Sequence, residues 1–330
     1  TKLDILTNET VQDIRSNISL TIFASGTSDK ALKYYTIPHS CNYEWNIQDE
    51  AYMKLLENSR NTNRESSIEL MTCRHGPMFK KCFEMTTVDN DYSKQPTQVL
   101  IKHSIPQSLV ERINQYNTVN STTYGYSCSS LFALGKIGTR NGEMVYKNQF
   151  ELCESNDGQA VLTSFLESII SNDTMRTNTI MKNVEKTQSN YLSRRSNNSH
   201  PLLFIMYLPT HTGNNNIVQL QRTLKEFCEQ NELWSNYNIE YSNATTDTTD
   251  TGKETYNAFI QSCMNRTKEM KKQGCILLLG NKGSVGVTYH KCDVTISLDD
   301  GHNLDTQTQR FARALTEADG KTIGINVDMN

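Results

Sequence analysis

Residues 275–313 read CILLLGNKGSVGVTYHKCDVTISLDDGHNLDTQTQRFAR. One apolar run, residues 275–279, ends at a glycine, and a second, residues 294–298, ends at two aspartates. Short apolar runs that each lead into a polar loop are typical of buried strands in a parallel sheet. Such strands present their following loops at one edge of the sheet, where α/β proteins bind ligands. The stretch therefore predicts an α/β fold with two buried strands and a functional edge.

The residues that follow, 304–315, predict a helix. Three large apolar residues can share one of its faces: Leu304, Phe311 and Leu315. Gln309, Arg310 and Arg313 then project elsewhere, toward whatever lies at the strand ends. Because a guanidinium is planar, always charged and able to bond bidentately, paired arginines suit phosphate oxygens.

These segments resemble a known family. GSVGVTY, residues 283–289, resembles motif V of superfamily 2 helicases, and QRFAR, residues 309–313, resembles the core of their motif VI, Q-R-x-G-R, with alanine for glycine. TE at 316–317 and LDDG at 298–301 resemble the helicases of large nucleocytoplasmic DNA viruses. Alone, either motif is an ordinary turn or a solvated helix face; together, in this order, they favour the family. The family carries a further arginine, a finger to the γ-phosphate, where this chain has Thr316.

Near the start, the β-rich run of residues 18–24 leads into Ser25, Gly26 and Thr27, which are similar to motif III of the family. Because motifs I and II precede motif III in the family, we expect them before Thr1. A Walker A loop needs G-x-x-x-x-G-K-[ST], and the Gly-Lys-Thr at 320–322 does not have the first glycine. The DEAD-like letters at 49–52 follow no buried strand, and we predict a helix start there.

The resemblance implies three segments. Residues 1–36 are expected to end a first RecA-like lobe, and residues 37–199 to form an inserted α+β region. Residues 200–330 are expected to form a second RecA-like lobe with a parallel sheet, in which FIMYLPT at 204–210 stands where motif IV belongs. We expect the last segment to fold by itself.

The family binds ATP and Mg²⁺ between two lobes and moves along nucleic acid. The resemblance implies that this chain contacts single-stranded nucleic acid and nucleotide through its motif III and motif V residues: Ser25, Gly26, Thr27, Gly283, Ser284, Gly286 and Thr288. Gln309, Arg310 and Arg313 would reach the phosphates. The partner implied is the first RecA-like lobe of the same protein. Without motifs I and II, we expect these residues not to hydrolyse ATP alone.

Two alternatives stay open. One is a degenerate helicase module that binds nucleic acid or a protein without turnover, which the missing arginine at position 316 motivates. The other is an unrelated nucleotide-binding α/β protein. The residues upstream of Thr1 would separate a motor from a degenerate module.

Composition narrows the class of protein. A formal net charge of −3 over 330 residues is not the footprint of a protein that holds duplex DNA by bulk charge. The sequence has local basic groups at 182–195 and 266–272, which we interpret as solvated helix surface in preference to a nucleic-acid contact. Nine scattered cysteines favour reduced, packed thiols over disulfides. We therefore expect the protein in the cytoplasm, which is that of a host cell or a viral factory if the protein is viral. Cys73, His75 and Cys82 form the cluster considered for zinc, without an evident fourth ligand.

Overall fold

The computed structural model describes residues 49, 51–54, 64–85, 96–140, 142–170, 201–209, 217–242, 256–280, 289, 291–299, 304–318 and 321–329. The chain forms two compact units, residues 1–93 and 94–330. The predicted lobe edge in residues 1–36, with its motif III residues, lies outside the described part. No helix in the described part is long and apolar enough to cross a membrane.

The first unit contains α4 (Arg64–His75) and α5 (Met78–Met85) around a small core of Met53 and Met71. Asp49 is helical, as predicted, and fully buried. Its carboxylate accepts from Arg74 Nε at 2.8 Å and lies 3.1 Å from His75 Nε2. His75 is thus engaged by Asp49, and Cys73 is exposed. Among the described residues, no group of three potential ligands could hold a metal.

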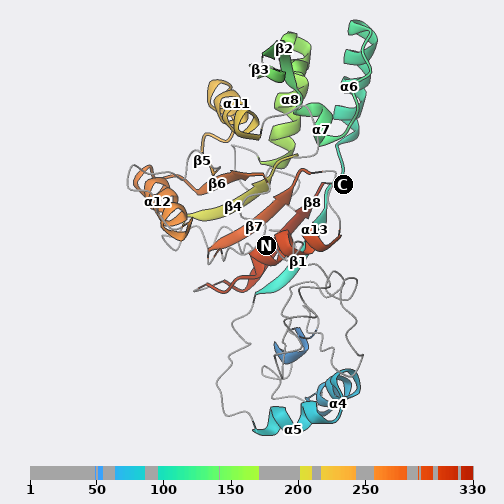
Figure 1. The fold of residues 1–330 in the computed structure, drawn as a ribbon, viewed down its shortest axis with the longest axis vertical. Coiled ribbons are helices and arrows are strands. Elements are labelled where there is room, and N and C mark those ends of the chain that lie inside the picture. Colours follow the sequence, from blue (N-terminus) through green and yellow to red (C-terminus); the bar gives the residue numbers. More distant parts are fainter. Residues whose placement is uncertain are drawn as a thin grey trace. The chain divides into compact units, whose positions relative to one another are not determined.

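The second unit is built on a six-stranded sheet (Figure 1). Its strands are β1 (Thr97–Lys102), β4 (Leu202–Tyr207), β5 (Tyr237–Tyr241), β6 (Gly274–Leu279), β7 (Cys292–Ser297) and β8 (Ile323–Asp328). Their order is β1-β8-β7-β4-β6-β5, and every pairing is parallel. The predicted fold class, an α/β lobe with a parallel sheet in a RecA-like arrangement, is confirmed.

The inner strands read as apolar runs because helices cover both faces. Phe204 and Met206 of β4 face α11 (Ile217–Gln230), whereas Ile205 and Tyr207 share a core with α12 (Tyr256–Glu269). The second face also holds α13 (Leu304–Phe311) and the 3₁₀ turn η5 (Ala312–Leu315). Together these two elements form the predicted helix over 304–315.

Between β1 and β4 the chain forms an α+β cap. It consists of α6 (Gln107–Asn120), α7 (Cys128–Leu131), the antiparallel hairpin β2 (Leu134–Arg140) and β3 (Glu143–Phe150), η4 (Glu151–Glu154) and α8 (Asn156–Ile169). Figure 1 shows it gathered on one side of the sheet. The apolar faces of α6 and α8 join the same core cluster as β4, β6 and β7.

This arrangement corrects the expected boundary at residue 200. Strand β1, from the stretch expected to be an insertion, pairs with β8 along its whole length. The cap does have the predicted α+β character, but it shares one continuous core with the sheet. A helix with one apolar face must bury that face against another element, and here the sheet supplies the surface. The structural boundary lies near residue 94.

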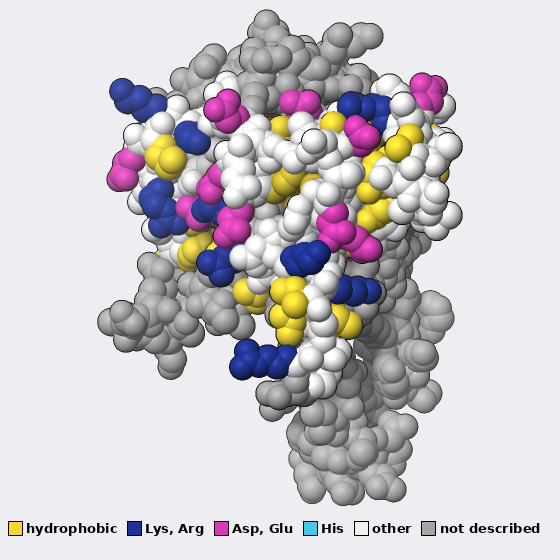
Figure 2. All heavy atoms as spheres, turned by 90° about the horizontal axis from the view of Figure 1, so that it is seen from above, with side chains coloured by type: hydrophobic (Ala, Val, Ile, Leu, Met, Phe, Trp, Pro, Cys, Tyr) yellow, Lys and Arg dark blue, Asp and Glu magenta, His cyan; other side chains and the backbone are white. Residues whose placement is uncertain are grey.

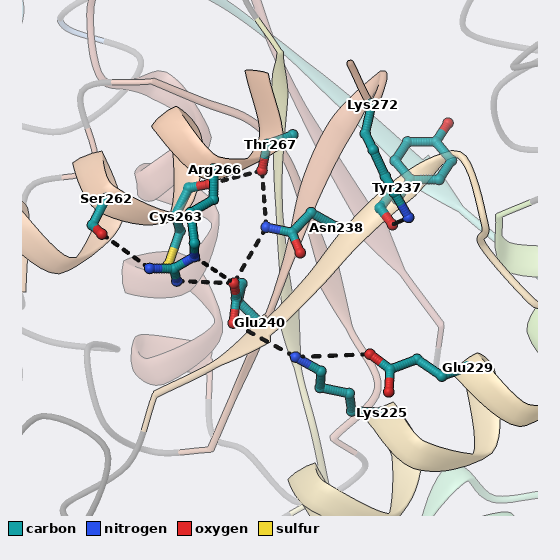
Figure 3. A network of polar contacts seen from close by, with 10 residues as sticks. All are labelled: Lys225, Glu229, Tyr237, Asn238, Glu240, Ser262, Cys263, Arg266, Thr267 and Lys272. Carbon is teal, nitrogen blue, oxygen red and sulfur yellow. Dashed lines mark hydrogen bonds and ion pairs between the residues drawn. The ribbon is translucent and has the colours of Figure 1, made fainter. Parts of the chain in front are cut away.

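The outer edge of the sheet is fastened by a polar network on β5 (Figure 3). Glu240 accepts from Arg266 Nε at 3.1 Å and Nη2 at 2.9 Å, and Lys225 Nζ lies 3.7 Å from its second oxygen. Asn238, which is buried, donates to Thr267 Oγ1 at 3.1 Å. These contacts tie α11 and α12 to an edge strand, and charges on an edge also discourage pairing with other chains.

One buried histidine predicts a dependence of stability on pH. His103 follows β1, is only 7% exposed, and its Nε2 has no hydrogen-bond partner in the described part of the chain. Burial lowers the pKa of His103 below its ordinary value of 6.5, so the unfolded chain binds the proton first. We therefore expect stability to decline as pH falls from 6.5, where the unfolded chain begins to protonate.

Urea titrations at successive pH values test this expectation, with His103→Gln as the control. The substituted chain has no proton to take up at this position, so its stability should depend less steeply on pH between neutrality and mild acid. An unchanged slope would assign the pH dependence to other groups.

Candidate functional site

The sheet has one topological switch point. From β4 the chain turns toward β5, whereas from β7, the neighbour of β4, it turns toward β8 on the other side. Open α/β sheets bind ligands beyond the carboxyl ends of strands at such a point. Here those ends are Tyr207 on β4 and the residues from Ser297 to Asp299 on β7. The candidate site lies at this edge.

Arg310, on α13, packs into the switch point. Its guanidinium carbon lies 4.6 Å from the centroid of the Tyr207 ring, and its two terminal nitrogens lie 3.3 and 3.4 Å from Asp299 Oδ2. All three side chains are buried, and Arg310 is 0% exposed. Burial lowers the pKa of Arg310, and the carboxylate of Asp299 acts against that change. Arg310 thus joins α13 to the ends of β4 and β7.

A second contact fastens α13 beside this one. Ser297 Oγ donates to Oε1 of Gln307 on α13 at 3.1 Å, and Ser297 belongs to a polar stripe along one face of β7. The stripe occupies every second position: Asp293, Thr295, Ser297 and Asp299. All four residues are buried. A period of two is the side-chain period of a strand, so the stripe faces α13 and η5 as a unit.

Arg313 lies apart from Arg310. It sits in η5 and is half-buried, on the segment that packs against β7 and β8. Burial raises the pKa of the Cys292 thiol to about 12, and the cations of Lys321 and Arg313 act against that rise. Because Cys292 begins β7, Arg313 is near the amino end of this strand, while Arg310 contacts residues at carboxyl ends.

The two predicted arginines therefore occupy different environments. Arg310 was expected to reach phosphates, yet its side chain is fully buried and bonded to Asp299, which is a structural position. Arg313 and Gln309 are partly exposed, and their contact with phosphates stays a prediction. The remaining predicted binding residues lie outside the described part: Ser25, Gly26, Thr27, Gly283, Ser284, Gly286 and Thr288.

The face of the molecule that Figure 2 shows has no patch of a single charge among its described residues. On the side that Figure 2 shows, basic and acidic side chains are interspersed with apolar ones. Of the basic group at 266–272, Arg266 is bonded to Glu240, and Lys272 Nζ donates to the carbonyl oxygen of Tyr237 at 3.1 Å (Figure 3). These two residues support the reading as structural surface. The group at 182–195 lies outside the described residues.

Sequence reasoning did not select Tyr207, Gln307 or Asp299 as site residues. A signal for Asp299 was present, because a polar residue at every second position of an otherwise apolar strand indicates a face that needs polar partners. Nothing in the local sequence marks Tyr207, since its ring becomes special only where α13 crosses the end of β4.

The fold and this edge define a class of protein: an α/β lobe with a parallel, RecA-like sheet and an arginine-bearing helix at its switch point. No protein-family model matches the sequence, and no curated protein matches it. Among solved structures, one that is similar is the C-terminal part of the Fun30 ATPase domain. It is 12% identical, with 71% of this chain and 84% of that chain covered at a TM-score of 0.31. A similarity of this size carries no argument about activity.

Proposed function

We propose that this chain is the carboxy-terminal part of a superfamily 2 helicase or translocase. Residues 94–330 would be its second lobe, which binds single-stranded nucleic acid and completes an ATP site formed with a first lobe. The observation that carries the proposal is the placement of α13 and η5: Arg310 anchors α13 at the switch point, and Arg313 of η5 is partly exposed. The order of the segments resembling motifs V and VI agrees with it.

In this proposal Arg313 is the residue of the lobe that faces a nucleotide phosphate, since a guanidinium binds phosphate oxygens bidentately. It would do so on the side of η5 near the amino end of β7, and not at the switch point that Arg310 occupies. Asp299 is already engaged by Arg310 and is a poor candidate for Mg²⁺. The metal and the lysine that position the γ-phosphate would come from motifs I and II on the first lobe. The resemblance of residues 298–301 and 316–317 to the helicases of large DNA viruses bears on the origin of the protein and stays a prediction.

A second candidate is a degenerate helicase module that binds nucleic acid or a protein partner without turnover. One observation favours it. Thr316, at the position of the family's further arginine, uses its hydroxyl to donate to the carbonyl oxygen of Arg313 at 3.2 Å. Arg310 is also held inside, so no second cation of this helix accompanies Arg313. An arginine finger is typically worth ~10³ or more in rate, and its loss would leave binding without a motor.

Binding and turnover are measured together. We expect the 330-residue chain to bind a fluorescein-labelled oligothymidylate, more tightly at low than at high salt, with phosphate release at background. Arg313→Gln should weaken binding of inorganic tripolyphosphate. Arg222→Gln is the matched control, because Arg222 is an exposed arginine on α11 whose ion pair in the described part of the chain is with Glu226 at 3.0 Å.

Robust ATP turnover by these residues alone would contradict the motif placement. Tight, sequence-specific binding of duplex DNA would indicate a different class of protein. Equal effects of the two substitutions on tripolyphosphate binding would remove Arg313 from the site.

A further inference from the structure

The segment that carries Arg313 lies unusually close to the last strand. A Cβ atom built on Gly324 of β8 would be 1.9 Å from the carbonyl oxygen of Ala314 and 2.6 Å from its carbonyl carbon. No real side chain tolerates such a contact with backbone. Ala314 is itself fully buried. The backbone of η5 therefore rests directly on β8 at a place where only glycine leaves room.

Space is the reason for glycine at this position. The φ angle of Gly324 is not in the left-handed region, so its conformation is open to other residues. Glycine inside a strand loses more conformational entropy on folding than a residue with a side chain and packs nothing. The entropy cost of a glycine in a buried inner strand is thus expected to be offset by a local gain. At Gly324 the geometry shows that gain to be the close approach of the η5 backbone.

We infer that Gly324 is a positioning residue for Arg313: its bare backbone seats η5 on β8 and so sets where the guanidinium of Arg313 lies. The inference rests on the proposed function insofar as Arg313 serves a ligand. The placement of Arg313 itself does not depend on that function.

Two hydrogen bonds, which we call the clasp, also hold η5 in place beside β8. Thr316 Oγ1 donates to the carbonyl oxygen of Arg313, and Lys321 Nζ donates to the carbonyl oxygen of Thr316 at 2.6 Å. Lys321 is only 4% exposed, and its backbone N–H donates to Ala318 at 3.0 Å. Residues 321–324 supply both the ammonium and the glycine, so the start of β8 contacts η5 at Ala314 and the residue after η5 at Thr316.

The test is Gly324→Ala in the full chain, read by the Nε–Hε NMR signal of Arg313 in arginine-labelled protein. The signal is identified by its loss in Arg313→Lys. We expect Gly324→Ala to shift it and to weaken tripolyphosphate binding about tenfold, the size of one lost charge-assisted hydrogen bond. The matched control is Gly274→Ala on β6, whose Cβ would also meet a backbone oxygen, that of Leu202, at 2.7 Å.

Loss of stability alone does not decide the matter, because both glycine substitutions are expected to destabilise the sheet. A moved Arg313 signal in Gly324→Ala, with the signal unmoved in Gly274→Ala, supports the inference. An Arg313 signal at its original position in Gly324→Ala overturns it. If the unsubstituted chain binds no tripolyphosphate, the proposed function fails while the NMR result still decides the positioning role.

Should Gly324→Ala fail to fold, Thr316→Val takes its place. This change keeps the side-chain shape and removes the hydroxyl that bonds to Arg313. We expect a smaller shift of the same Arg313 signal. A signal identical to that of the unsubstituted chain would show that the clasp does not position Arg313.

Discussion

A fragment of residues 94–330 is expected to fold cooperatively, whereas a fragment of residues 200–330 is expected to remain largely unfolded. The shorter fragment loses β1, the partner of β8, and the whole α+β cap. The cap covers one face of the sheet with large buried side chains from α6, from α7 and the residue after it, and from α8: Leu109, Ile113, Leu131, Phe132, Leu162, Phe165, Leu166 and Ile169. Each fully buried side chain of this kind contributes about 1.5–3 kcal/mol, so their joint loss is as large as the whole stability of a typical domain, about 5–15 kcal/mol.

Circular dichroism and urea titration of the two fragments measure this difference. A third fragment, residues 106–330, removes β1 but keeps the cap, and we expect it to fold with reduced stability. Cooperative unfolding of residues 200–330 alone would contradict the shared core. It would restore the boundary that the sequence pattern had suggested.

Removal of Asp299 is expected to be the most damaging single change at the candidate site. Asp299→Ala leaves the guanidinium of Arg310 buried without its carboxylate, and breaking a buried ion pair in this way costs about 3–5 kcal/mol. Both side chains are fully enclosed, so water cannot replace the lost partner. We expect Asp299→Ala to lower the urea midpoint sharply and to loosen α13.

The double variant Asp299→Leu with Arg310→Met is the control. Replacing a buried ion pair by apolar residues of similar size is often close to neutral, so most of the lost stability should return. The N···O distances of 3.3 and 3.4 Å are long for a charge-assisted bond. Long distances mean a weak attraction, so replacing the pair should cost little stability. A double variant no more stable than Asp299→Ala would mean that the pair supplies more than mutual neutralisation.

If the double variant is stable and still binds tripolyphosphate, Arg310 serves the structure and Arg313 the ligand. If binding is lost although stability returns, Arg310 takes part in binding through a rearrangement that releases it from Asp299.

The local pattern of the chain was sufficient for the elements around the candidate site. The apolar run at 275–279 and the one at 294–298 are β6 and β7, and the helix over 304–315 is α13 with η5. These predictions succeed because burial on both faces demands a continuous apolar strand, and helix burial demands a repeat of three to four residues. Both requirements act over a few neighbouring residues.

The extent of the lobe was not available from such patterns. The residues of β1 are all exposed or partly exposed, and its sequence resembles a strand of any sheet. Its partner, β8, lies near the other end of the chain, and only the folded sheet joins them. In the same way, no local feature of α6 or α8 reveals which apolar surface their buried faces meet.

The chemistry of the site also has a part that the sequence determines and a part that only packing determines. The amino-acid order placed arginines on a helix after a parallel strand, because residue type and periodicity are properties of adjacent positions. Which arginine is enclosed and which is left at the surface depended on the crossing of α13 over the ends of β4 and β7. That crossing brings Tyr207 and Asp299 to Arg310, and the glycine of β8 lets η5 settle beside it. Contacts between residues distant in sequence arise from packing, and packing is a property of the assembled lobe.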